Sequence, residues 1–455
     1  MERAEGNNNF YKEMIGIALP ITLQNLIANS VNMLDTLMIS SLGAQSLAAV
    51  GFANQVFFLY AVTIFGIATG SSIFVAQFWG KKDKNNIRRI IGISLVLSGL
   101  LGLIFTLAVI IFPESIMRIF SKDPEVIKLG MDYLAIIVFT YIITGISFTF
   151  SIASRSIGQA KMPMIVSIVS FVTNGIFNYL LIFGKFGFPK LGVRGAAYGT
   201  LIARVIELAL VLYAIYSDRE NPLAGSIGDM TDWNRDFFKR YLNTTYPVII
   251  NEALWSLGNV MYSIAYAKIG TNAAASVQIL NVIYNLFMVL ARGMANACTV
   301  MVGNKIGAEE EDIAIDYANR FLKLSTLIGG IMGFTLYIFS DNILGIFKNL
   351  EPEVYVMSKD LLIVLSIFFF IKAMNSTLIV GVLRGGGDTK FSMKLEMAAV
   401  WLVGVPLAFL GAVYLKLPVH LVVTLVYAEE VIKAAIGIPR VMSKKWVKNV
   451  IRDMT

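Results

Sequence analysis

Long apolar stretches follow one another along the whole chain, separated by short polar connections. A helix that crosses a bilayer needs about 20 predominantly apolar residues. Twelve stretches meet this length, and their bounds are 14–40, 47–78, 90–112, 131–154, 163–184, 195–216, 242–268, 274–304, 319–340, 358–383, 393–414 and 418–440. The pattern therefore predicts an all-α integral membrane protein with twelve transmembrane helices.

Composition supports a membrane protein and argues against several other classes. Of the 455 residues, 56% are hydrophobic and 15% are charged, whereas a soluble domain carries about 25% charged residues. The chain has a single cysteine, Cys298, and a single histidine, His420. Disulfide frameworks and multi-histidine metal sites are therefore excluded. We expect no enzyme active site and no cofactor, and the absence of a phosphate-binding GxxxxGK[ST] loop argues against an ATP-driven pump.

Basic residues are distributed unevenly over the connections. If both termini are cytoplasmic, the cytoplasmic segments carry more than twice as many Lys and Arg residues as the opposite side. Cytoplasmic loops of membrane proteins are enriched in these residues. We therefore expect a multi-pass protein of the plasma or inner cell membrane with both ends inside. The net charge of +8 then reflects these loops and predicts no nucleic-acid partner.

The two halves of the chain resemble each other. A shift of 227 positions superimposes Pro20 on Pro247, Gly43 on Gly270, Gly66 on Gly293 and Gly80 on Gly307, and a shift of 229 superimposes Arg155 on Arg384. The alternative is a coincidence of small residues in apolar helices. The repeat predicts two six-helix lobes related by pseudo-two-fold symmetry, a plan common in secondary transporters. The expected parts are an N-lobe (1–216), a cytoplasmic linker (217–241), a C-lobe (242–440) and a cytoplasmic tail (441–455).

Polar residues within the first, fifth and sixth stretches are candidates for ion binding. Asp35 has no basic residue within one turn, so its carboxylate is a candidate cation or proton site; the alternative is a cap at a helix end. Asn174 and Asn178 are four residues apart and share one helix face. Their amide oxygens suit sodium, and Thr200 adds a hydroxyl, although such residues also form hydrogen bonds between membrane helices.

Glu252 is the most conspicuous charge of the seventh stretch. Trp255, Ser256 and Asn259 share its helix face. A carboxylate beside an aromatic ring suits a monovalent cation or a stacked cationic drug. The alternative is a structural salt bridge to Arg292 or Lys372, which have no acid close in sequence.

Two further pairs of oppositely charged residues lie close together in the sequence. Glu207 follows Arg204 by three residues, and Lys433 follows Glu430 by three. This spacing favours local ion pairs on one helix face.

Six segments together resemble the multidrug and toxic compound extrusion (MATE) family, NorM-like branch. They are ALPITLQNLIANSVNMLDTLMISSLGAQSLAAVG, SRSIGQAKMPM, TNGIFNYLLIFG, LGVRGAAYGT, NEALWSLGNVMYSIAYAKIGTNAAASVQI and VLRGGGDTKF. The resemblance implies two six-helix lobes around a central cavity. It also implies export of organic, often cationic, compounds driven by entry of sodium or protons.

The resemblance also assigns roles to individual residues. The family's cation site in the amino lobe is matched by Asp35, Asn174, Asn178 and Thr200. The first three are candidate ligands of Na⁺. In the carboxy lobe, the candidates for substrate or cation binding are Glu252, Trp255, Asn259, Arg292 and Lys372. The acid that the family carries in the tenth helix is replaced by Ala373, so the amino-lobe site is expected to be the main coupling site.

The predicted function is therefore a cation-coupled multidrug efflux antiporter, coupled to Na⁺ or H⁺. Its expected partners are small organic, often cationic and aromatic, substrates and membrane lipids, and we expect a monomer. The alternative is a lipid-linked precursor flippase or polysaccharide exporter of the same superfamily. Such a protein needs basic groups in its cavity for phosphate, and Arg292 and Lys372 keep this alternative open.

Overall fold

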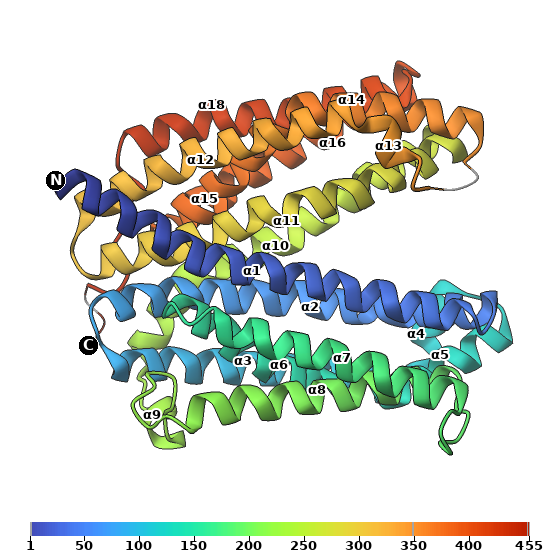
Figure 1. Ribbon diagram of the computed structural model, residues 1–455, viewed down its shortest axis with the longest axis horizontal. Helices are drawn as coiled ribbons and strands as arrows, with labels where there is room; N and C mark the ends of the chain where they lie inside the picture. The colour runs from blue at the N-terminus through green and yellow to red at the C-terminus, as the bar shows by residue number, and fades with distance from the viewer. Residues whose placement is uncertain (1, 348–349, 453, 455) are drawn as a thin grey trace. The chain divides into compact units, whose positions relative to one another are not determined.

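The computed structural model describes residues 2–347, 350–452 and 454, and these residues are almost entirely helical (Figure 1). The first half of the chain contains α1 (Glu2–Ser40), α2 (Ala44–Gly80), α3 (Lys84–Ile111), α4 (Pro113–Phe120), α5 (Pro124–Ile137), α6 (Thr140–Ser156), α7 (Lys161–Phe183), α8 (Val193–Tyr216) and α9 (Ile227–Thr231). The second half contains α10 (Arg235–Ile269), α11 (Thr271–Gly307), α12 (Glu311–Ile338), α13 (Ser340–Leu344), α14 (Pro352–Ser376), η1 (Thr377–Arg384), α15 (Thr389–Ala398), η2 (Ala399–Gly404), α16 (Val405–Phe409), η3 (Leu410–Tyr414), α17 (Val419–Val426) and α18 (Ala428–Met442). The three η elements are π-helical turns that continue α14 and α15.

Most of the predicted spans are long apolar helices. Within the described residues, nine helices are long and apolar enough to cross a membrane, or ten if α5 and α6, which meet at a 49° bend, form one span. The other two predicted stretches correspond to α10 and to the pair α17 and α18. Asn251, Glu252 and Asn259 lower the apolarity of α10, and the pair is broken into helices of eight and 15 residues. The predicted helical membrane fold is thus confirmed.

Two compact units divide the described chain. The amino unit consists of Leu23–Trp79 and Asp83–Thr245, and the carboxy unit of Met1–Thr22, Gly80–Lys82 and Tyr246–Met454. The long helices α1 and α10 each belong partly to both units, and each passes from one to the other within two residues of its internal proline, Pro20 or Pro247. Because proline lacks the N–H that bonds the preceding turn, the helix is weakest at these two points.

In the amino unit, α7 packs along α8 and α3 along α6. Three aromatic rings fill the centre of its core. Tyr60 and Tyr141 stack with centroids 5.2 Å apart, and Phe105 lies 5.5 Å from Tyr60. The Tyr60 hydroxyl donates to the backbone oxygen of Tyr141, so the buried phenol keeps a polar partner. These rings join α2, α3 and α6, and α6 in turn contacts α7 and α8, which carry most of the candidate site.

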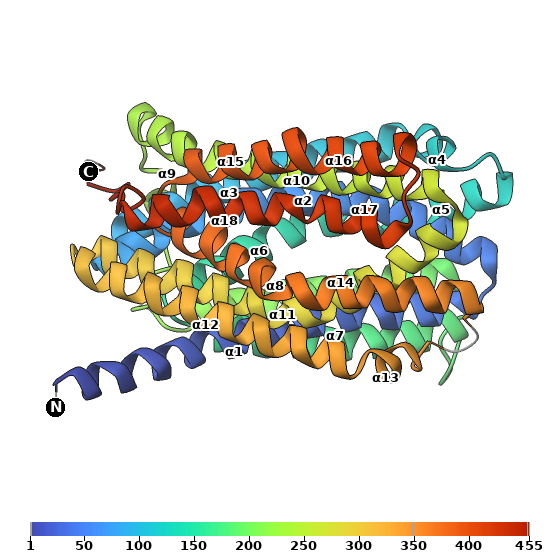
Figure 2. The ribbon, with the colours of Figure 1, turned by 90° about the horizontal axis from the view of Figure 1, so that it is seen from above.

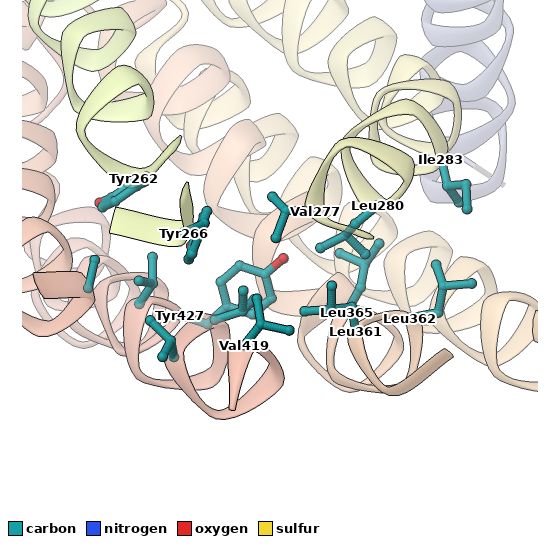
Figure 3. Packing of buried hydrophobic residues seen from close by; sticks show 14 of the residues in the cluster. Tyr262, Tyr266, Val277, Leu280, Ile283, Leu361, Leu362, Leu365, Val419 and Tyr427 are labelled. Atoms are coloured by element: carbon teal, nitrogen blue, oxygen red, sulfur yellow. The ribbon is translucent and has the colours of Figure 1, made fainter. Parts of the chain in front are cut away.

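The core of the carboxy unit combines side chains from α10, α11, α14 and α17 with Tyr427 at the break before α18. Figure 3 shows Tyr262 and Tyr266 of α10 in the same cluster as Tyr427, with Leu361 and Leu365 of α14 nearby. Figure 2 shows α17 and α18 in succession on either side of this break. The three tyrosines bring hydroxyl groups into this apolar core, beside the charged residues described below.

The chain after α18 packs tightly on the turn that follows η1. Trp446 is fully buried, and the Lys448 backbone N–H donates to the oxygen of Gly386 at 2.8 Å. Asp388, only 1% exposed, accepts from Arg440 at 2.8 Å and from Lys448 at 2.6 Å. The GGGD sequence therefore provides a glycine turn and a buried carboxylate that hold the C-terminal segment.

We expect Gly386→Ala to lower stability. A Cβ at this position would lie 2.2 Å from Cε3 of Trp446, and such overpacking costs about 1–3 kcal/mol. The melting temperature of the purified protein in detergent should therefore fall. Gly330→Ala is the matched control, because a Cβ at Gly330 in α12 has nothing within 4 Å. Equal melting temperatures for both variants would contradict the packing described here.

Candidate functional site

The first candidate site lies in the amino unit, near the end of α1. Asp35 accepts a hydrogen bond at its Oδ1 from Nδ2 of Asn178, at 2.6 Å. The same amide nitrogen donates to Oδ1 of Asn174 at 3.2 Å, and Nδ2 of Asn174 donates to the Thr200 hydroxyl at 3.3 Å. The structure thus brings the four predicted residues, which we call the Asp35 cluster, into one hydrogen-bonded chain across α1, α7 and α8.

One atom of the Asp35 cluster is left without a partner. Oδ1 of Asn178 is buried and accepts no hydrogen bond, and the residue is 0% exposed. An unsatisfied buried acceptor costs about 1–3 kcal/mol. Gly199 of α8 faces this oxygen, since a Cβ there would lie 2.1 Å from it. The cluster therefore holds a free oxygen beside a carboxylate, next to a position where no side chain intrudes.

The charged residues near Asp35, Arg204 and Glu207, form an ion pair with each other. Arg204 pairs with Glu207 at 2.7 Å, which confirms the predicted local pair. Glu207 also accepts from Ser170 at 3.1 Å. Although the charge of Arg204 acts on Asp35, the guanidinium makes its short contact with Glu207. The direct partner of the Asp35 carboxylate is a neutral amide.

The second candidate site lies in the carboxy unit, and its pairing differs from the prediction. Glu252 bonds Arg384, with Nη1 2.5 Å from Oε1, and not Lys372 or Arg292. The alternative considered for Glu252, a salt bridge, is present, but its expected partner, Arg292 or Lys372, is wrong. The predicted bounds leave Arg384 just beyond the tenth stretch (358–383), but it ends η1 with a side chain only 5% exposed. The π-helical turn extends the buried part of the tenth stretch by one residue beyond its predicted end at 383.

Arg384 holds a second carboxylate that sequence reasoning missed. Its Nη2 lies 3.3 Å from Oε2 of Glu396 in α15. The same carboxylate oxygen accepts from Nδ2 of Asn251 at 2.5 Å. We call Asn251, Glu252, Arg384 and Glu396 the Arg384 cluster. The sequence does contain a sign of this role, because Glu396 is an acid inside the predicted apolar stretch 393–414. The only basic residue within one helical turn of it is Lys394.

Lys372 belongs to a separate group of buried charges. It bonds Glu430 at 3.2 Å, and Asn375 donates to the other oxygen of that carboxylate at 2.7 Å. Lys433 lies 3.3 Å from Glu429 and 3.5 Å from Glu430, which confirms the predicted pair of Glu430 and Lys433. We call these four residues, Lys372, Glu429, Glu430 and Lys433, the Lys372 cluster. Its two positive and two negative charges cancel.

The remaining candidates in the carboxy unit do not join these clusters. Trp255 is 38% exposed, and the amide of Asn259 donates to the Trp255 backbone oxygen at 2.8 Å. Arg292 donates to Oδ1 of Asn285 on its own helix at 3.0 Å. No contact of Trp255, Asn259 or Arg292 with Glu252 appears among the side-chain hydrogen bonds and ion pairs of the described residues. Their predicted role in binding stays a prediction.

The donor set indicates what these sites are able to bind. Across the described residues, no three His, Cys, Asp or Glu side chains converge as a metal centre. The Asp35 cluster offers one carboxylate with amide and hydroxyl oxygens. Hard neutral oxygens with a single negative charge suit a proton or an alkali cation.

Comparison with known proteins gives the same family as the sequence resemblance. The MatE family model matches residues 20–180 and 247–410. The chain is 27% identical over 412 residues to the probable multidrug resistance protein YoeA of Bacillus subtilis, covering 90% of this chain and 88% of that protein. It is 26% identical over 441 residues to the probable multidrug resistance protein NorM of Thermotoga maritima, covering 97% and 94%.

Solved structures show the same fold. An outward-facing multidrug resistance MATE family transporter of the MOP superfamily superimposes with a TM-score of 0.85 at 21% identity, covering 95% of this chain and 96% of that chain. A MOP superfamily transporter from Pyrococcus furiosus gives a TM-score of 0.84 at 21% identity, with the same coverage. The family match spans both halves of the sequence, and the protein is therefore a multi-pass membrane transporter that belongs to the MatE family.

Proposed function

We propose that this protein is a cation-coupled multidrug efflux antiporter that exports organic, often cationic, compounds. Membership of the MatE family and the names of the relatives support the export of drugs. The observation that carries the coupling is the Asp35 cluster, in which a half-buried carboxylate of an apolar helix has a neutral amide as its hydrogen-bond donor. A charge in such surroundings costs several kcal/mol unless an ion or proton compensates it.

In this proposal the ion changes the charge of Asp35. An arriving proton neutralises the carboxylate, and an arriving Na⁺ takes oxygens of Asp35, Asn174 and Asn178 as ligands. Either event gives the free oxygen of Asn178 a partner and rearranges the hydrogen bonds that run from α1 through α7 to α8. Coupling then follows if substrate and ion bind the same conformations with different affinities.

The topology that we propose follows from the distribution of basic residues. Both termini are cytoplasmic, and the chain lies in the cell membrane as a monomer. The N-lobe (1–216) and the C-lobe (242–440) alternate the access of a substrate site between the two sides of the membrane, joined by the linker 217–241. The segment 441–455 lies on the cytoplasmic side, where its packing on the turn after η1 closes the end of the C-lobe.

The alternative, transport of a phosphate-bearing lipid-linked precursor, loses one of its two supports. It depended on free cations at Arg292 and Lys372. Lys372 is neutralised by Glu430 and lies over the ring of Tyr427 at 4.1 Å. A compensated lysine does not provide a phosphate site, so we favour the export of organic cations.

Transport under separated ion gradients tests this function. The purified protein is reconstituted in liposomes with a fluorescent organic cation, and a Na⁺ gradient or a proton gradient is imposed without ATP. We expect one of the two gradients to drive the dye against its concentration gradient. Dye movement that ignores both gradients would overturn the proposal of an ion-coupled antiporter.

A further inference from the structure

An arginine of the amino unit occupies the position that Arg384 has in the carboxy unit. At shifts of 227 and 229 positions, the internal repeat pairs each member of the Arg384 cluster with a residue of the first half: Asn251 with Gln24, Glu252 with Asn25, Arg384 with Arg155 and Glu396 with Ser167. We call these residues of the first half the Arg155 cluster. Both glutamates of the carboxy unit are thus replaced by neutral residues in the amino unit, while the arginine is kept.

The hydrogen bonds of the Arg155 cluster follow the same plan as those of its counterpart. Oε1 of Gln24 accepts from Nε of Arg155 at 3.1 Å and from Nη2 at 2.5 Å. Nε2 of Gln24 donates to the hydroxyl of Ser167 at 2.9 Å, as the amide of Asn251 donates to Glu396. The cluster joins α1, α6 and α7 and lies within the amino unit. The repeat is therefore present in side-chain contacts as well as in the sequence.

The charge of Arg155 is not compensated by an acid. Its side chain is half-buried, and the group that accepts its hydrogen bonds, the amide of Gln24, is neutral. Among the described residues, no carboxylate forms an ion pair with Arg155 or acts on its guanidinium through its charge. Arg384, by contrast, contacts both Glu252 and Glu396. A partly buried charge without a counter-ion is costly, so Arg155 favours an anion beside it.

The Arg155 cluster also has donors to spare. Nη1 of Arg155 forms no hydrogen bond with a described residue. It is not one of the buried atoms left without a partner, so a ligand can reach it. The hydroxyl of Ser167 accepts from Gln24, and its own proton has no acceptor among the described residues. Because serine is shorter than glutamate, it also leaves unfilled the place that the carboxylate of Glu396 takes in the carboxy unit.

We propose that the Arg155 cluster binds a carboxylate group from outside the chain, in the place that the Glu396 carboxylate takes in the carboxy unit. Arg155 provides the charge and N–H groups, and Ser167 provides the hydroxyl. The planar fork of a guanidinium matches the two oxygens of a carboxylate, and the repeat places carboxylates beside the equivalent Arg384. The occupant carries a single negative charge, because Arg155 is the only cation of the cluster. Small acids in water and fatty acids in the membrane both carry this group.

An exchange of anions tests the site in the purified protein. Sodium chloride is replaced by sodium acetate at constant ionic strength, and the melting temperature in detergent is followed. We expect a rise that saturates with the acetate concentration, because a ligand that binds only the folded state stabilises it. Arg155→Gln should remove this rise, since glutamine keeps an amide that donates to Gln24 but carries no charge.

Variants that supply the missing carboxylate from the chain make the test specific. Ser167→Glu and Asn25→Glu each copy one acid of the carboxy unit. Both are expected to abolish the response to acetate, because their own carboxylate neutralises Arg155. Ser217→Glu is the matched control: it adds the same charge at an exposed position of the amino unit, and it should keep the response of the unaltered protein.

General effects of acetate on stability act on all variants alike, so the difference between variants decides. The site is overturned if the unaltered protein does not respond to acetate, or if Arg155→Gln responds as strongly. A response that persists in both Ser167→Glu and Asn25→Glu overturns it as well. If Ser167→Glu fails to fold, Asn25→Glu decides in its place.

Decanoate as a further probe separates the two sources of the carboxylate. A half-maximal response at a far lower concentration of decanoate than of acetate assigns the site to fatty acids of the membrane, and equal concentrations assign it to acids in water. Only a response that Arg155→Gln removes counts, because the apolar chain of decanoate also binds apolar surface. The measurement needs no transport, so its result is independent of the proposed antiport.

Discussion

Asp35→Asn is expected to abolish gradient-driven efflux of organic cations. The asparagine keeps an oxygen that accepts from Asn178, so the hydrogen bond seen at 2.6 Å is retained. It cannot change its charge, and the ion therefore has nothing to neutralise. We expect dye efflux in energised vesicles to fall to the level of empty vesicles, while the amount of folded protein in the membrane and its melting temperature stay close to those of the unaltered protein.

Asp132→Asn is the matched control for this variant. Asp132 is a carboxylate of the same unit that pairs with Arg194 at 2.8 Å. The side chains of Asp132 and Arg194 are 29% and 58% exposed. Exposed pairs of this kind contribute about 0–1 kcal/mol, so efflux should be unchanged. Efflux by Asp35→Asn at the level of the control would remove Asp35 from the mechanism.

Arg384→Met is expected to destabilise the carboxy unit strongly. The methionine leaves Glu252 and Glu396 buried without their cation, and removal of one partner of a buried ion pair costs about 3–5 kcal/mol. The melting temperature in detergent should fall sharply. The loss should shrink at low pH, where protonation removes the uncompensated charges, and in the triple variant that adds Glu252→Gln and Glu396→Gln.

Arg118→Met provides the comparison for a lost arginine. Arg118 pairs with Glu114 at 2.6 Å, but both side chains are more than half exposed, so its removal should change the melting temperature little. A loss for Arg384→Met no greater than for Arg118→Met would show that the carboxylates are not held by this guanidinium.

The parts of the site that sequence could predict are those set by helix geometry. Asn174 and Asn178 share a face because they are four residues apart, and Glu430 and Lys433 meet because they are three apart; the structure confirms both contacts. Asp35 stood out as a lone carboxylate in an apolar stretch. Its approach to α7 was implied by the resemblance and not by spacing, because it bridges 143 residues.

Contacts between distant helices were beyond the reach of these patterns. Glu252 and Arg384 are 132 residues apart, and spacing within a helix says nothing of which helix lies opposite. The apolar pattern also ends one residue before Arg384. The π-helical turn η1 includes Arg384, whose side chain is buried. Among the described residues, α10 and the pair α17 and α18 are not in the set of helices long and apolar enough to cross a membrane, although they carry Glu252, Glu430 and Lys433.

The central claim is that ion binding at Asp35 and substrate binding are energetically linked, and linkage is reciprocal. The most direct measurement therefore reverses the transport experiment: a gradient of the organic cation is imposed across liposomes that contain the protein, and the counterflow of H⁺ or Na⁺ is recorded. The account predicts ion movement opposite to the substrate, absent in Asp35→Asn. Substrate flux with no ion movement, or with equal ion movement in Asp35→Asn, would contradict it.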